Sequence, residues 1–129
     1  MECVKRLLVA DASQEFRCHL VESFQNEPDM EVIGETGDGL QLLELTQTLL
    51  PDVIVMEMVL SGLDGLEVLE RLRGLSLERQ PKILVLSSYV RGSIADLAAA
   101  NGADHYMVKP CRFSTICARI RQLLSLIHI

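Results

Sequence analysis

The sequence predicts a single α/β domain built around a doubly wound parallel sheet. Short apolar runs alternate with segments of helical periodicity along the 129 residues, a length that suits one domain with a substantial core. Runs such as 53–56 are apolar at every position, as is typical of parallel strands buried on both faces. Because right-handed crossovers restrict the topology, five such strand–helix units favour the doubly wound arrangement.

Five strands are expected where apolar runs are bounded by turn residues or polar residues. The third run is the most apolar, so we expect it at the centre of the sheet. The strands are predicted at 4–10, 30–34, 53–56, 83–86 and 105–108.

Five helices are expected between and after these strands. In the first, Phe16, Leu20 and Phe24 recur every four residues and therefore share one face. Ser93 and Asp96 form a Ser-x-x-Asp start signal for the fourth, and Asn101-Gly102 fits its C-terminal cap. The helices are predicted at 13–26, 40–50, 65–73, 93–101 and 112 to about 124.

Composition and charge exclude several classes of protein. The net charge is −6 and no stretch is dense in Lys or Arg, so nucleic-acid binding by this domain is not expected. The apolar segment 7–12 is short and contains Asp11, which argues against a signal peptide or membrane span and favours a cytoplasmic location. The four cysteines form no Cys-x-x-Cys pair and are expected to stay reduced. The domain is predicted to cover 1–125, with 126–129 a truncated end or a foreign tail.

Polar side chains follow four of the predicted strands at the point where each strand ends. In a doubly wound sheet these ends lie along one edge, where ligands bind. Each residue alone is typical of a turn or a helix cap. Together they predict one pocket that contains two carboxylates, a hydroxyl and an ammonium group, supplied by Asp11, Glu57, Ser87 with Ser88, and Lys109 before Pro110.

Five segments resemble the receiver domain of bacterial two-component response regulators, and the resemblance spans about residues 4–124. They are Val9-Ala10-Asp11, 51–57, 62–69, 83–89 and 102–110. The resemblance implies a flavodoxin-like fold with five helices and strand order 2-1-3-4-5. Within the family the chain is most similar to the receiver of the stage-zero sporulation transcription regulator, through 29–34, 68–73 and Gln80-Pro81.

The resemblance implies a signalling protein of a phosphorelay, and not an enzyme. In the family a strand-three Asp takes a phosphoryl group from a histidine kinase or phosphotransfer protein, with Mg²⁺ held by nearby oxygens. The same family signals through the face formed by 93–101, 105–108 and 112–124, which also serves for homodimers. The positions that match are Asp11, Glu57 and the Val59 carbonyl for Mg²⁺, Ser87 and Lys109 for the phosphoryl group, Tyr106 as the switch aromatic, and a cis bond before Pro110.

Three positions depart from the family pattern. Ala12 replaces a second acid, which lowers the formal charge of the pocket from about −2 to about −1 and predicts weak or absent Mg²⁺ binding. Glu57 replaces the phosphoacceptor Asp and is longer by about 1.5 Å. A misplacement of that size costs on the order of 10²-fold in a positioned reaction. Ser61 replaces a Pro, which is expected to leave its loop more mobile.

Four functions stay open at this point. The first is a degenerate receiver that acts by protein contact, with a Glu57–Lys109 pair in place of phosphate. The second is a receiver that is phosphorylated weakly and regulates sporulation-type transcription through a DNA-binding domain absent from this sequence. The third is a flavodoxin-like cofactor binder or small hydrolase, which lacks support because 11–15 contains neither a phosphate-binding loop nor an Asp-x-Asp motif. The fourth is an inactive fragment.

Overall fold

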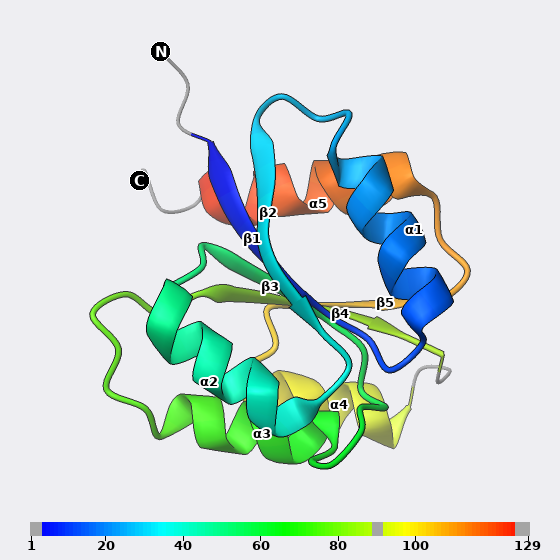
Figure 1. Ribbon diagram of the computed structural model, residues 1–129. Helices are drawn as coiled ribbons and strands as arrows, with labels where there is room; N and C mark the ends of the chain where they lie inside the picture. The colour runs from blue at the N-terminus through cyan, green and yellow to red at the C-terminus, as the bar shows by residue number, and fades with distance from the viewer. Residues whose placement is uncertain (1–3, 89–91, 126–129) are drawn as a thin grey trace.

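The computed structural model describes residues 4–88 and 92–125, and it has the predicted fold class. Five parallel strands form one sheet in the order β2-β1-β3-β4-β5, with β3 at the centre (Figure 1). This is the expected order. The strands are β1 (Lys5–Ala10), β2 (Met30–Thr36), β3 (Val53–Met56), β4 (Lys82–Ser87) and β5 (His105–Val108).

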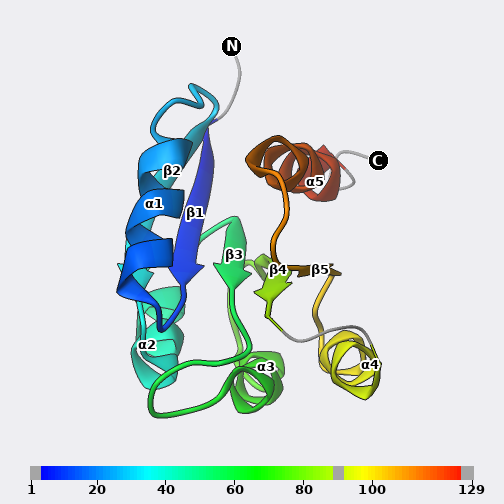
Figure 2. The same ribbon diagram turned by 90° about the vertical axis from the view of Figure 1, so that its right-hand side faces the viewer.

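Five helices cover the two faces of the sheet. Two of them lie against one face and three against the other, so that the strands form the middle layer of three (Figures 1 and 2). The first pair is α1 (Gln14–Phe24) and α5 (Phe113–Ser125), and the opposite face carries α2 (Gly39–Leu49), α3 (Gly65–Arg73) and α4 (Ser93–Ala100).

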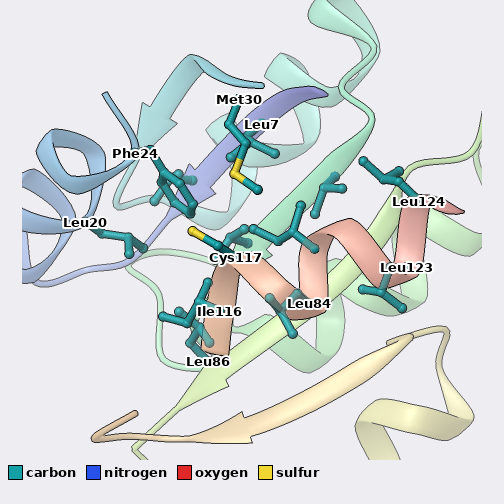
Figure 3. Packing of buried hydrophobic residues seen from close by; sticks show 14 residues of the cluster. Leu7, Leu20, Phe24, Met30, Leu84, Leu86, Ile116, Cys117, Leu123 and Leu124 are labelled. Carbon is teal, nitrogen blue, oxygen red and sulfur yellow. The ribbon is translucent and has the colours of Figure 1, made fainter. Parts of the chain in front are cut away.

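Alternation along the strands divides the core into two clusters. Successive side chains of a strand point to opposite faces, so Val53 and Val55 face α1 and α5, whereas Ile54 and Met56 face the other three helices. Figure 3 shows the first cluster, in which Phe24 of α1 meets Cys117 of α5 above the sheet. All four residues of β3 are buried, which explains why its sequence is apolar throughout.

Several element boundaries differ from the prediction. Strand β2 continues through Glu35 to Thr36 because both pair with β1, and neither is apolar enough to have been recognised as strand. Asp38 caps α2 by accepting a hydrogen bond from the Gln41 N–H. The N-cap of α4 is Gly92 and not Ser93, and no side chain caps it.

Two further sequence predictions, reduced cysteines and no membrane-spanning segment, can be compared with the described residues. Cys18, Cys111 and Cys117 are free thiols, and burial raises the pKa of Cys117 to about 11. Cys3 and the predicted tail 126–129 lie outside those residues. Within residues 4–88 and 92–125, every helix is too short or too polar to cross a bilayer.

A charged cluster ties α5 to the turn before β2. Arg121 donates to both carboxylate oxygens of Asp29, at 2.9 Å each, and to Glu27 at 2.7 Å. Lys5 lies 3.5 Å from the same Asp29 carboxylate. The hydrogen bonds from Arg121 hold the pKa of Asp29 well below its ordinary value. The bidentate geometry makes this the best-formed surface ion pair of the described chain.

We expect Arg121→Ala to lower the free energy of unfolding by about 1 kcal/mol at neutral pH. Because the pKa of Asp29 is depressed in the folded state, this stabilisation is fully present above about pH 4 and declines progressively as the pH falls from there through the lowered pKa. Urea unfolding at pH 7 and pH 3 measures the difference. Arg71→Ala is the control, since its pair with Glu67 spans 4.0 Å and both side chains are about half exposed. An equal loss in both variants would contradict the prediction.

Candidate functional site

The ends of four strands, β1, β3, β4 and β5, lie at one edge of the sheet and carry the predicted polar residues. Hydrogen bonding continues one residue past each strand: the Glu57 N–H donates to the Ala10 carbonyl at 2.9 Å, and the Lys109 N–H donates to the Ser87 carbonyl at 2.8 Å. These bonds fix the backbone where the charged side chains leave it. The sheet therefore brings Asp11, Glu57 and Lys109 together, as the sequence predicts.

Glu57 lies in a cradle of hydrogen-bond donors. Its Oε1 accepts hydrogen bonds from the backbone N–H and the Oγ–H of Ser88, both at 3.0 Å, and lies 3.3 Å from Lys109 Nζ. Its Oε2 accepts a hydrogen bond from the Met58 N–H at 2.6 Å. The residue is only 4% exposed. A buried carboxylate requires such compensation, so the side chain is held in one position as an anion.

Lys109 lies between the two carboxylates and is drawn more closely to Asp11. Its Nζ is 2.6 Å from Asp11 Oδ2, against 3.3 Å from Glu57 Oε1. The ring of Phe16 lies under the same ammonium group, with 3.8 Å from Nζ to the ring centroid. The second oxygen of Asp11 accepts a hydrogen bond from the Ser13 N–H at 2.9 Å. Two carboxylates, one ammonium and one aromatic face thus form a closed charge cluster.

Ser87 and Tyr106 lie on the strands to which the sequence assigns them, Ser87 at the end of β4 and Tyr106 in β5. Ser87 is fully buried at the end of β4. Tyr106 of β5 is half-buried and packs against the cluster beneath α3 and α4. The Lys109–Pro110 peptide bond is cis.

The sequence did not indicate the roles of three neighbours. Phe16 was assigned only to the buried face of α1, yet it also contacts the ammonium of Lys109. Ser88 was grouped with Ser87 as an end-of-strand hydroxyl, yet it donates twice to Glu57. Arg17 donates to the Asp11 carbonyl at 2.6 Å and so fixes the backbone of that acid. A helical residue six positions after an acid carries no sequence signal for such a contact.

The loop after β3 is tied down rather than loosened at Ser61. The Ser61 N–H donates to the Gly37 carbonyl at 2.9 Å, and the Gly39 N–H donates to the Ser61 carbonyl at 2.9 Å. A Pro has no N–H and could not make the first bond. Ser61 therefore adds a hydrogen bond between two loops that its sequence position does not predict.

The family model for the response regulator receiver domain matches residues 7–121 of the chain. The chain belongs to this family. A protein-glutamate methylesterase/protein-glutamine glutaminase of Methanospirillum hungatei is 37% identical over 107 residues, which is 81% of this chain and 31% of that relative. The chain thus spans about a third of the length of that relative. Because the chain belongs to the receiver family, the two other hypotheses from the sequence, a flavodoxin-like cofactor binder and a small hydrolase, are set aside.

Solved receiver structures agree with the fold. The receiver domain of NarL from Mycobacterium tuberculosis is 27% identical with a TM-score of 0.85, and 96% of each chain is covered. The response regulator domain of CheB from Thermotoga maritima is 29% identical with a TM-score of 0.83, covering 92% of this chain and 95% of that one. The receiver of AraT from Geobacillus stearothermophilus is 28% identical with a TM-score of 0.81, covering 98% and 99%.

Receiver domains generally bind Mg²⁺ at the phosphorylation site and interact with kinases or phosphotransfer proteins. In this receiver the carboxylate oxygens predicted to hold Mg²⁺, both of Asp11 and both of Glu57, already have hydrogen-bond or ion-pair partners. Val59, whose carbonyl was the third predicted ligand, is a 46% exposed loop residue. Across the described ranges no three His, Cys, Asp or Glu side chains are grouped to hold a metal ion.

Proposed function

We propose that this receiver is a degenerate signalling domain, not an enzyme, in which Glu57 takes the place of a phosphorylated residue. One observation carries the proposal. The Glu57 carboxylate is bound by two backbone N–H groups, a serine hydroxyl and Lys109, which is the type of donor set that holds an oxyanion.

The same contacts argue against Glu57 as an acceptor of phosphate. A carboxylate that attacks a phosphoryl group needs one oxygen free to approach it in line. Both oxygens of Glu57 are engaged and the residue is buried. Ala12 leaves the pocket with one acid fewer to attract a cation, so we propose that Mg²⁺ binds weakly or not at all.

The proposed output surface is the face formed by α4, β5 and α5. Tyr106 of β5 packs towards α4, and Leu97 of α4 is 46% exposed. We propose that this face binds a histidine kinase, a phosphotransfer protein or a second copy of the chain. The position of Glu57 would set the state of the face without a phosphoryl group.

We expect the unmodified receiver to take up no phosphoryl group from acetyl phosphate in the presence of Mg²⁺. Intact-protein mass spectrometry measures the adduct, with a receiver that has Asp at this position as the positive control. A stable adduct in this receiver that disappears in Glu57→Ala would contradict the proposal.

A second candidate is a receiver that accepts phosphate weakly and regulates transcription of the sporulation type, through a DNA-binding domain outside these 129 residues. The retained Asp11–Lys109 pair favours it, because both groups serve phosphotransfer in the family. The mass measurement separates this candidate from the first.

A further inference from the structure

The donors that bind the Glu57 carboxylate differ in their distance from Glu57 along the sequence. The Met58 N–H belongs to the next residue, so its bond to Oε2 orients the carboxylate without linking β3 to another strand. Ser88 is 31 residues away and belongs to the end of β4. Of these contacts of the Glu57 carboxylate, those with Ser88 and Lys109 therefore join the side chain to another part of the described fold.

Distances indicate which of these two partners fixes Glu57. Lys109 lies 3.3 Å from Oε1 but 2.6 Å from Asp11, and the ring of Phe16 holds its ammonium from a third side. Lys109 is therefore centred on Asp11. Ser88 directs both its N–H and its hydroxyl at the same oxygen of Glu57, each at 3.0 Å.

Ser88 is an exposed residue, so burial does not force its hydroxyl to find a protein partner. Water is available to it, and it nevertheless donates to a buried carboxylate. Hydrogen bonds to a charged acceptor are about twice as strong as neutral ones, which explains this preference.

Ser88 also stands at the start of the connection to α4. That helix has Gly92 as its N-cap with no side-chain hydrogen bond, and Ala98 is its one buried residue. Few buried side chains therefore fix its position. Within the described residues, the end of β4 reaches the proposed output face through β5, with which it pairs as far as Ser87 and Val108.

We propose that Ser88 is a positioning residue whose hydroxyl and N–H hold Glu57 Oε1 and couple the tip of β3 to the end of β4, and through β4 to β5 and the output face. The inference rests on the proposed function of Glu57 as a replacement for phosphate. The hydroxyl adds a donor to the cradle, in a pocket where Ala12 removes an acid and Lys109 is shared with Asp11.

The test is a double-mutant cycle read by ¹H–¹⁵N NMR on the amides of α4, β5 and α5. Glu57→Ala defines the released state. We expect Ser88→Ala to shift the same amides along the same line, because losing one hydrogen bond to a charged group lowers the ratio of held to released Glu57 about tenfold. Ser88→Thr keeps the hydroxyl and is expected to retain the original shifts. Ser76→Ala, on the exposed connection between α3 and β4, is the matched control because it lies outside the three elements that are read.

In the Glu57→Ala background, Ser88→Ala is expected to add no shift in α4, β5 or α5. A shift that persists there would overturn the inference and make Ser88 a structural residue only. If Glu57→Ala moves the three elements but Ser88→Ala does not, the inference fails and the proposed function stands. If Glu57→Ala moves none of them, the proposed function fails and the inference falls with it.

Discussion

Lys109→Met is expected to lower the free energy of unfolding by about 3–5 kcal/mol at neutral pH. Within residues 4–88 and 92–125, the Lys109 ammonium is the one cation paired with both Asp11 and Glu57, whose side chains are 6% and 4% exposed. Met fills a similar volume and keeps the contact with Phe16, but it leaves two buried carboxylates without a counter-ion. Urea-induced unfolding followed by circular dichroism measures the change.

Three companion variants identify the cause of this loss. Lys109→Arg keeps the charge and is expected to be milder. Lys82→Met removes a half-buried lysine at the opposite end of β4 and is expected to change stability by less than about 1 kcal/mol. Lys109→Met combined with Glu57→Gln removes one of the stranded charges and is expected to recover part of the loss. A Lys109→Met protein as stable as the Lys82→Met control would show that the ion cluster does not stabilise the fold.

The fold was predictable because its strongest signals are local. The run 53–56 is apolar at every position, since β3 is buried on both faces, and Phe16, Leu20 and Phe24 mark the buried side of α1. The end of β2 was not predictable: Glu35 and Thr36 are strand only because β1 pairs with them. Backbone pairing with a distant segment leaves no mark on the residue types of the paired strand.

The sequence predicts which residues of the site lie close together. It does not predict which of them form hydrogen bonds or ion pairs with one another. Because the sheet is parallel, the topology alone places Asp11, Glu57 and Lys109 at one edge, independently of their side-chain contacts. Lys109 Nζ lies closer to Asp11 than to Glu57, at 2.6 against 3.3 Å. The spacing of these residues in the sequence does not encode a difference of tenths of an ångström. The hydrogen bond from Ser61 to Gly37 was missed for a similar reason, because it forms between two loops brought together only in the folded chain.

The double variant Ala12→Asp with Glu57→Asp is expected to gain Mg²⁺-dependent phosphorylation by acetyl phosphate, from none detectable to stoichiometric uptake. Asp at 57 withdraws the carboxylate by about 1.5 Å. That shift takes it away from the donors of Ser88 and leaves them free for an incoming phosphoryl group. Asp at 12 stands beside Asp11 at the start of the exposed loop after β1, which makes the formal pocket charge about −2 with Lys109 included.

The two single variants show whether Ala12, Glu57 or both prevent phosphorylation of the site. Glu57→Asp alone restores the shorter carboxylate without the second acid, so we expect slow uptake that needs higher Mg²⁺ concentrations. Ala12→Asp alone is expected to bind Mg²⁺ more tightly than the unmodified receiver, measured by thermal stabilisation, yet to take up no phosphoryl group. If Ala12→Asp alone is phosphorylated, Glu57 is a competent acceptor and its cradle of donors does not block reaction. If the double variant stays unmodified while binding Mg²⁺, residues other than 12 and 57 block the reaction.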